Sequence, residues 1–367
     1  ILTALAACMF AATASWASAQ GVKGFLSKAF GSHMNDVAQK IAELPDPTSG
    51  AIDFNPVFSP DGSLLASFGN SDSSKIDIWD WRNHHLLRKL DVLGDPEFAL
   101  EPLAFSPDGR FLALCTAGED HYTAVRVWNA ATWQVAADIV DFHSPGCSAV
   151  AFSADSRMLL RVNNLTVSSA PDDVVAYSTE TWQKQWGLQD KRIEAMTLAV
   201  SPKGNHVAIG GFRYVPWPNH IVDMREPQVA LLDLQQRKYI NILSPALGGR
   251  TPVDSMSWSP DGTRLAVLGN TDFEIYDVSS GQRLTHQNLP YGAPTSIRYS
   301  PNGKYLVINS FIGPNGPKPG FGMQIWDGQA SALLQTNSVD TAGIAFSPDS
   351  RFLAAAVRGR IEIWQFK

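Results

Sequence analysis

Cysteine is scarce in this sequence, with three in 367 residues: Cys8, Cys115 and Cys147. Three cysteines cannot form paired CxxC zinc sites or the dense disulfide framework of small secreted domains. We interpret Cys115 and Cys147 as two small core residues. A disulfide between them stays open as an alternative, because it requires two Cα atoms that lie close together in the fold.

Recognisable catalytic motifs are also missing. The chain has no HExxH, Walker or GxSxG sequence, so we expect no catalytic residues, no cofactor and no metal site. His84 and His85 adjoin Asp80, but we do not expect a metal at this turn. The net charge is −6, and no cluster of five or more Lys or Arg is present. This balance argues against nucleic-acid binding, which needs a basic face.

What the sequence has instead is a four-residue phrase that recurs seven times. It reads SPDG or a close variant, and its first serine stands at positions 59, 106, 153, 201, 259, 300 and 347. The successive spacings are 47, 47, 48, 58, 41 and 47 residues. Pro at the second position and Gly at the fourth favour a type I turn, which we expect to survive with slightly more strain at Ser156 and Ser350. A period of this length indicates one unit repeated around a closed architecture.

Each phrase lies between two apolar strings, and a third string follows that usually ends in an aromatic residue. The third strings are Ile76–Asp80, Val125–Asn129, Val174–Ser178, Val229–Asp233, Phe273–Asp277, Met323–Asp327 and Ile361–Gln365. Their alternation predicts that one side chain in two faces a core. A more variable fourth string follows, such as His85–Leu90. Four strands in each of seven units predict an all-β fold, a seven-bladed β-propeller of four-stranded antiparallel blades.

The ends of the third strings resemble the WD-repeat family. The resemblance rests on Trp79-Asp80 and Trp326-Asp327, each about 20 residues after an SPDG-like turn, and it covers about residues 37–367. It implies structural roles for Trp79, Asp80, Trp128, Trp326, Asp327 and Trp364. The Gly-His pair that the family usually carries is absent, and only His143 lies near its place. We therefore expect blades held mainly by apolar packing rather than by the family's His–Ser–Asp–Trp network.

Ring closure is also predicted. The last repeat stops after its third strand, with Lys367 three residues past Trp364. The segment Val37–Leu44 ends 15 residues before Ser59, just as His85–Leu90 ends 16 residues before Ser106. We expect the N-terminal segment to form the fourth strand of blade seven, because this removes an exposed sheet edge. Residues 37–367 would then form one monomeric propeller.

Residues 1–19 are uncharged and apolar, and they end in small residues. This stretch resembles a secretory signal peptide cleaved after Ala19, and it is short for a membrane span. Two alternatives stay open: a buried element, and a bacterial lipoprotein signal ending at Cys8. Residues 20–36 form a lead-in segment with the spacing of a short amphipathic helix. We expect a periplasmic or extracellular protein, with an outer-membrane lipoprotein as the alternative.

Variation in loop length falls on one face, which carries the connections from second to third strands. Blade four has the insertion Phe212–Gln228, which explains the 58-residue spacing, and blade six has Phe311–Gly322. Both loops mix aromatic and cationic residues, the types enriched at interface hot spots. The candidate partner-binding residues are Arg213, Tyr214, Trp217, His220, Arg225, Phe311, Lys318 and Phe321. Alternatively, Trp217 folds back as a lid over the channel.

These observations predict a non-catalytic scaffold, exported to the bacterial envelope, that binds a protein partner on its long-loop face. The alternative is a propeller lactonase or hydrolase that uses a cation in the central channel. Its ligands would come from Asp72, Asp120, Asp172 and Asp272, which lie in connections from second to third strands. Such residues more often cap turns through the local backbone.

Overall fold

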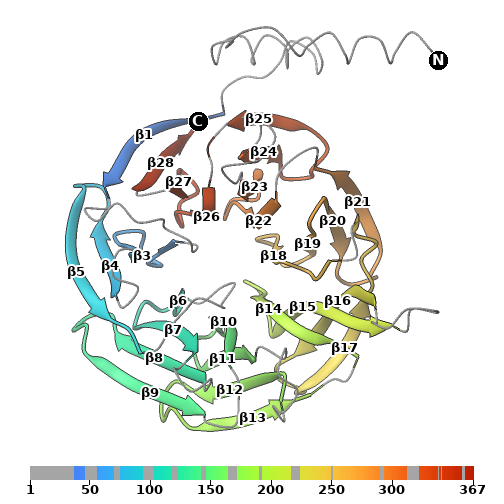
Figure 1. Ribbon diagram of the computed structural model, residues 1–367, viewed down its shortest axis with the longest axis horizontal. Coiled ribbons are helices and arrows are strands. Elements are labelled where there is room, and N and C mark those ends of the chain that lie inside the picture. Colours follow the sequence, from blue (N-terminus) through green and yellow to red (C-terminus); the bar gives the residue numbers. More distant parts are fainter. Residues whose placement is uncertain are drawn as a thin grey trace, which may run out of the picture. The chain divides into compact units, whose positions relative to one another are not determined.

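Seven four-stranded antiparallel sheets are arranged in a ring around a central channel (Figure 1). The structure is a computed structural model, and it describes residues 37–45, 56–69, 75–93, 103–117, 123–141, 146–163, 172–189, 192–215, 224–248, 251–289, 293–311, 322–337, 339, 341–357 and 360–367. The expected signal peptide and lead-in segment lie outside these residues. No helix in the described part of the chain is long and apolar enough to cross a membrane.

The first four blades follow one another along the chain, each from its innermost to its outermost strand. They consist of β2 (Val57–Phe58), β3 (Leu65–Gly69), β4 (Lys75–Asp80) and β5 (His85–Asp91); β6 (Leu103–Phe105), β7 (Phe111–Ala117), β8 (Thr123–Asn129) and β9 (Val135–Asp141); β10 (Cys147–Phe152), β11 (Met158–Asn163), β12 (Val174–Ser178) and β13 (Lys184–Leu188); β14 (Glu194–Val200), β15 (His206–Val215), β16 (Met224–Asp233) and β17 (Lys238–Leu243).

The last three blades complete the ring. They consist of β18 (Ser255–Trp258), β19 (Arg264–Leu268), β20 (Asp272–Asp277) and β21 (Arg283–Asn288); β22 (Ala293–Tyr299), β23 (Tyr305–Phe311), β24 (Met323–Asp327) and β25 (Leu333–Asn337); β26 (Thr341–Phe346), β27 (Phe352–Val357), β28 (Arg360–Phe366) and β1 (Ala38–Pro45). The predicted seven-bladed, four-stranded fold is therefore confirmed.

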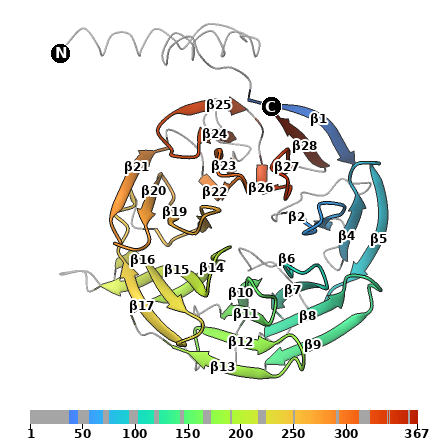
Figure 2. The ribbon, with the colours of Figure 1, turned by 180° about the vertical axis from the view of Figure 1, so that it is seen from behind.

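The ring closes as the spacing predicted, because β1 is the fourth strand of blade seven. It pairs antiparallel with β28, from Ala38 opposite Phe366 to Pro45 opposite Arg360. Gln335 of blade six also holds this strand: its Oε1 accepts the N–H groups of Val37 (2.7 Å) and Ala38 (2.9 Å), and its Nε2 donates to the Ala38 carbonyl (2.8 Å). The view from behind shows β1 and β28 side by side (Figure 2).

The seven SPDG-like turns share one backbone conformation. Their fourth residues all have φ between 60° and 96°, the left-handed region that favours glycine. Ser156 and Ser350 adopt it as well, at a cost of about 1 kcal/mol each. Their hydroxyls accept inter-blade hydrogen bonds from the N–H groups of Asp108 (3.0 Å) and Asn302 (2.8 Å). Each bond contributes about 1 kcal/mol, which offsets the cost of the left-handed conformation.

The core is divided into seven apolar clusters, and each cluster lies between two adjacent blades. Between blades seven and one, for example, Trp79 and Trp81 pack against Ile361 and Ile363. The blades are thus joined mainly by apolar contacts, as expected from the missing Gly-His pairs.

The expectation that one side chain in two of each third strand faces a core is wrong. In β4 the four central residues are all buried, and β20 and β28 show the same pattern. The reason is that neighbouring blades cover both faces of each blade. Polar residues at alternate positions, such as Asp77, Glu274 and Glu362, are therefore buried rather than exposed to solvent.

The interpretation of Cys115 and Cys147 as unbonded core residues is also wrong. Both are buried, but their sulfurs form a disulfide with the Cα atoms 5.8 Å apart. Cys115 lies on β7 of blade two and Cys147 on β10 of blade three, so the bond joins neighbouring blades. This distance depends on how two blades pack together, which the spacing in sequence does not reveal.

Candidate functional site

The blade-four insertion extends the sheet instead of forming only a loop. Strands β15 and β16 pair over ten residues, up to Val215 opposite Met224. The second and third strands of the other blades pair over five to seven residues. The expectation of a loop over Phe212–Gln228 is therefore wrong for residues 212–215 and 224–228. These residues belong to β15 and β16 and form a two-stranded ladder. Figure 1 shows the hairpin running toward the edge of the ring.

Cationic and aromatic side chains occupy the end of this hairpin. Arg213 lies opposite Glu226, and its Nη2 is 2.7 Å from a carboxylate oxygen. The guanidinium of Arg225 lies 4.7 Å from the ring centre of Phe212 and 5.9 Å from that of Tyr214. The two rings meet edge to face at 5.1 Å. Phe212 is buried, whereas Tyr214 is 49% exposed.

The hairpin carries three of the eight predicted partner-binding residues: Tyr214 and Arg225 lie opposite each other on one face of the ladder, and Arg213 lies on the other face. Phe311 is the last residue of β23 in blade six. Trp217, His220, Lys318 and Phe321 lie outside the described residues, and so does the proposed lid position of Trp217. The described contacts order the hairpin locally, since an arginine over two rings fixes side chains that would otherwise rotate freely.

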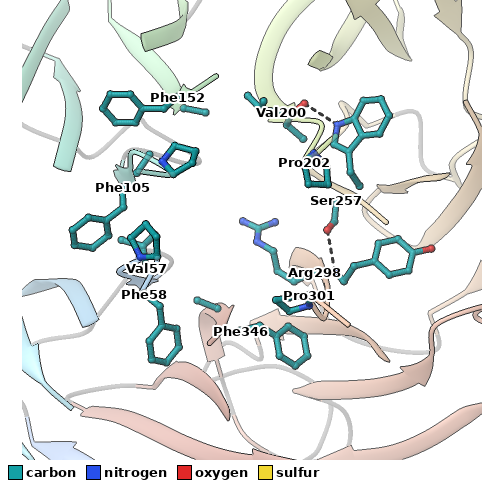
Figure 3. Close-up of a pocket in the computed structure, with 18 of the residues that line it drawn as sticks. Val57, Phe58, Phe105, Phe152, Val200, Pro202, Ser257, Arg298, Pro301 and Phe346 are labelled. Carbon is teal, nitrogen blue, oxygen red and sulfur yellow. Dashed lines mark hydrogen bonds between the residues drawn. The ribbon is translucent and has the colours of Figure 1, made fainter. Parts of the chain in front are cut away.

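The central channel opens into a cavity of about 750 Å³ on the face of the SPDG-like turns. Its wall consists of residues from the innermost strands and of turn prolines such as Pro60, Pro202 and Pro301. Figure 3 shows the rings of Phe58, Phe105 and Phe152 pointing away from the middle of the channel. The cavity is therefore lined mainly by apolar residues of the innermost strands and by the prolines of the turns.

No aspartate or glutamate is among the described residues that line this cavity. Asp172 forms an ion pair with Lys184 at 2.7 Å, and Asp272 accepts the N–H of Gly248 at 2.9 Å. Asp72 and Asp120 lie outside the described residues. No group of three or more His, Cys, Asp or Glu in the described part could hold a metal ion. The structure therefore gives no support to the lactonase alternative with a channel-bound cation.

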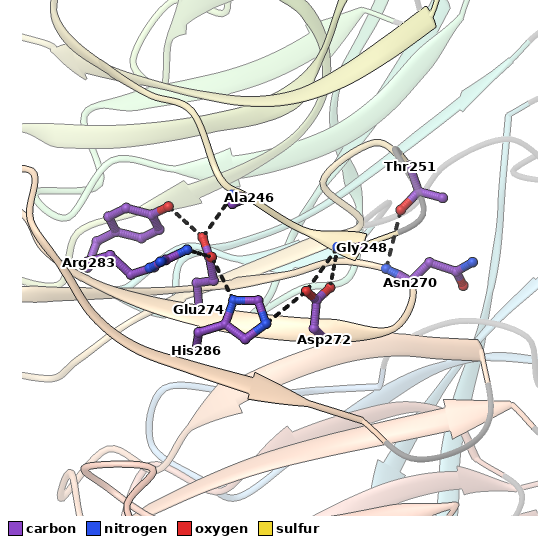
Figure 4. Close-up of polar contacts among 9 residues, drawn as sticks. Ala246, Gly248, Thr251, Asn270, Asp272, Glu274, Arg283 and His286 are labelled. Atoms are coloured by element: carbon purple, nitrogen blue, oxygen red, sulfur yellow. Dashed lines mark hydrogen bonds and ion pairs between the residues drawn. The ribbon is translucent and has the colours of Figure 1, made fainter.

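The sequence interpretation missed a buried network of charged residues between blades four and five (Figure 4). Glu274, fully buried on β20, accepts hydrogen bonds from Tyr276 (2.5 Å) and Arg283 (2.6 Å). His286 lies between two carboxylates, 3.0 Å from Glu274 and 3.2 Å from Asp272. Burial pushes the pKa of Glu274 upward, but the hydrogen bonds from Tyr276, Arg283 and His286 outweigh it, so this pKa is lowered.

The network fixes the connection between the two blades. The Oε2 of Glu274, which accepts from Tyr276, also accepts the N–H of Ala246 at 3.3 Å, and Asp272 accepts the N–H of Gly248. Corresponding buried carboxylates elsewhere pair with fourth-strand or neighbouring cations, as Asp77 does with Lys89 and Glu362 with Lys40. Glu274 and Asp272 thus hold backbone N–H groups of the connection, whereas Asp77 and Glu362 pair with cationic side chains.

Comparisons with known proteins agree with this architecture. A family model described as "Eukaryotic translation initiation factor eIF2A" matches residues 232–365. Periodic tryptophan protein 2 of Arabidopsis thaliana is 23% identical over 313 residues, which is 83% of this chain and 30% of that protein. Serine-threonine kinase receptor-associated protein of Gallus gallus is 22% identical over 209 residues, or 56% of this chain and 51% of that protein. The chain thus spans about a third to a half of these relatives.

The chain is a WD-repeat-like β-propeller. The matches, together with the seven blades and the Trp-Asp ends of the third strands, support this statement.

In this WD-repeat-like propeller the expected structural residues lie on the third strands of blades one, two, six and seven. Trp79, Trp128, Trp326 and Trp364 are all buried. The Nε1 of Trp79 donates to the Ser67 hydroxyl at 3.2 Å, so part of the family's polar network is present in blade one. Asp80 and Asp327 accept hydrogen bonds in the turns that follow, from Asn83 and Ser331 respectively.

Proposed function

We propose that this chain is a non-catalytic protein-interaction propeller that binds a partner protein through its β15–β16 hairpin on the long-loop face. The observation that carries the proposal is the exposed Tyr214 beside Arg225, on a hairpin that extends a rigid sheet. Tyr and Arg are enriched among residues that dominate binding energy. Because the sheet already orders these side chains, they lose little further conformational entropy when a partner binds.

The similarity to WD-repeat proteins supports a scaffold role, since the relatives include one whose name describes it as receptor-associated. The described lining of the cavity contains no carboxylate, so it gives no support to a cation-dependent hydrolase. The acidic balance supports a partner other than nucleic acid. We further propose that the propeller acts as a monomer.

We also propose that the protein is exported, to the periplasm or the cell surface. The apolar stretch at residues 1–19 supports this, and the Cys115–Cys147 disulfide is a second, independent support. Disulfides persist in oxidising compartments and are rare where thiols are kept reduced. Thiol labelling of the protein taken directly from cells should find this pair oxidised; two free thiols would contradict export.

The binding proposal is tested by affinity capture from native cell extract. We compare the wild-type chain with the triple variant Arg213→Ala/Tyr214→Ala/Arg225→Ala and with Trp217→Ala. Arg110→Ala/Arg157→Ala is the matched control, because these arginines lie on the opposite, tight-turn face. The proposal expects a defined partner that the control retains and the hairpin variants lose. Loss only in the tight-turn control would assign binding to the other face.

A further inference from the structure

The side chains at the end of the β15–β16 hairpin are directed toward two different neighbouring blades. Successive side chains of a strand lie on opposite sides of its sheet. On β15, Ala208 packs against Val253 at the entrance to blade five, whereas Ile209 packs in the cluster between blades three and four. Tyr214 continues the row of Ala208, and Arg225 lies opposite Tyr214 on β16. Both side chains therefore lie on the side of the sheet that faces blade five.

The two arginines of the hairpin differ in how their charges are compensated. On the side of blade three, Arg213 donates from Nε (3.0 Å) and Nη2 (2.7 Å) to one carboxylate oxygen of Glu226. On the side of blade five, the exposed guanidinium of Arg225 lies over Phe212 and Tyr214. Among the described residues, no carboxylate forms an ion pair with Arg225. The rings attract its charge without accepting its N–H groups as a carboxylate does.

We propose that this side of the hairpin binds an acidic segment of the partner protein. An aspartate or glutamate of that segment pairs with Arg225, and an apolar side chain next to it packs on the exposed ring of Tyr214. The inference rests on the proposed partner-binding function and specifies the chemistry of the partner. A guanidinium matches a carboxylate with two parallel charge-assisted hydrogen bonds. The rings beside Arg225 restrict its rotation, so less entropy is lost when this pair forms.

The distribution of charge on the hairpin favours a single carboxylate over a polyanion. A nucleic acid or an anionic membrane binds to several cations on one face. Of the two arginines in the described part of the hairpin, Arg213 is already compensated by Glu226. Glu194 lies opposite Phe212, so it shares the side of Arg225 and repels a continuous run of negative charge. A peptide segment can instead place one acidic residue on Arg225 and direct its other residues away from Glu194.

The test uses pairs of synthetic peptides and the full chain. The members of a pair differ only at one central residue, which is glutamate in one and glutamine in the other, and both have apolar neighbours on either side. An array of such pairs with varied neighbours is screened, and the pair that binds most tightly is titrated by fluorescence anisotropy. We expect the wild-type chain to bind the glutamate peptide at least about ten-fold more tightly than the glutamine peptide.

Substitutions of the two arginines provide the matched comparison. Arg225→Gln should remove the preference for glutamate, and Arg225→Lys should retain only part of it, because lysine keeps the charge but lacks the planar fork. Arg213→Gln removes the same charge from the other side of the hairpin. It should leave the preference within about two-fold of the wild type, because exposed charges at a distance are screened by salt. Thermal melts establish that each variant is folded.

The inference and the proposed function fail through different results. Equal binding of both members of every peptide pair, or binding of none, would overturn the acidic partner while leaving the hairpin as a binding site. A preference that survives Arg225→Gln or is lost in Arg213→Gln would overturn the assignment to Arg225. Retention of the captured partner by Arg213→Ala/Tyr214→Ala/Arg225→Ala would instead contradict the proposed function itself.

Discussion

At the scale of single residues, Asp254 has a pKa far from its ordinary value. It precedes the innermost strand of blade five, and burial raises the pKa of its carboxyl group to about 7. The folded state therefore binds this proton more strongly than the unfolded state, where the pKa is about 3.9. The contribution of Asp254 makes the protein less stable as the pH rises from about 4 to 7.

Replacing Asp254 by Asn removes this unfavourable charge. We expect Asp254→Asn to match the wild type at pH 4 and to be more stable at pH 8, by up to about 4 kcal/mol, because each pKa unit is worth about 1.4 kcal/mol. Denaturant unfolding at pH 4, 6 and 8 measures the difference. A constant difference across that range would contradict the account.

The pKa of Asp277 is shifted in the opposite direction from that of Asp254. Hydrogen bonds from Ser279 and Ser280 lower its pKa to about 2. Its charged form therefore stabilises the fold above about pH 4, and that contribution is lost as the pH falls toward 2. Asp277→Asn should reduce stability at pH 7 and have a smaller effect near pH 2, as followed by the same unfolding measurements.

At the scale of strands and turns, the β1 strand is predicted to control closure of the ring. Deleting residues 37–44 exposes the edge of β28 and removes three hydrogen bonds to Gln335, so we expect an insoluble or strongly destabilised product. Gln335→Ala should cost about 2–3 kcal/mol by chemical denaturation, since each lost bond contributes about 1 kcal/mol. Gln39→Ala, on the exposed side of β1, is the control. A monomeric deletion variant with unchanged melting temperature would disprove this role.

The disulfide joins β7 and β10 across a blade interface. It closes a loop between residues 32 apart in sequence, so the chain-entropy estimate gives a stabilisation of about 3–4 kcal/mol. We expect Cys115→Ser/Cys147→Ser to lose about this much, and reduction of the wild type to reproduce the loss. Reactive thiols at both Cys115 and Cys147 in the unreduced, unfolded wild type would show that the bond is not formed.

Much of this element-level architecture is predictable from the sequence, and the exceptions have physical causes. The turns, the third strands and the closing strand follow from the repeat, because each depends on local residues or on a fixed spacing. The disulfide and the buried Glu274 depend on how two blades face each other, which no single repeat encodes. The extended strands β15 and β16 were missed because their aromatic and charged residues also suit a binding loop.

The charged position in the channel wall was visible in the sequence but not interpretable without the ring. Aligning the seven turns places Arg298 where the other repeats carry small or uncharged residues. Only the closed ring brings these seven positions around one cavity. Without the ring, an arginine in one strand would be interpreted as an exposed surface residue.

At the scale of the whole molecule, the two faces have different properties. The tight-turn face is regular and surrounds a cavity whose described lining is mostly apolar, with Arg298 as its one charged residue. The long-loop face carries the irregular connections, including the projecting hairpin of blade four. We infer from this asymmetry that the long-loop face, rather than the regular tight-turn face, carries the partner-binding surface.

The central claim is that the β15–β16 hairpin contacts a partner protein, and site-specific photo-crosslinking in native extract tests it most directly. A photoreactive residue replaces Tyr214 in one variant and Leu87 or Ile240 in the controls. These rim residues are 49% and 45% exposed, which matches the 49% of Tyr214. The account predicts a discrete adduct with a second protein at position 214 and none at positions 87 and 240. Adducts only at the rim, or equally at all three positions, would contradict it.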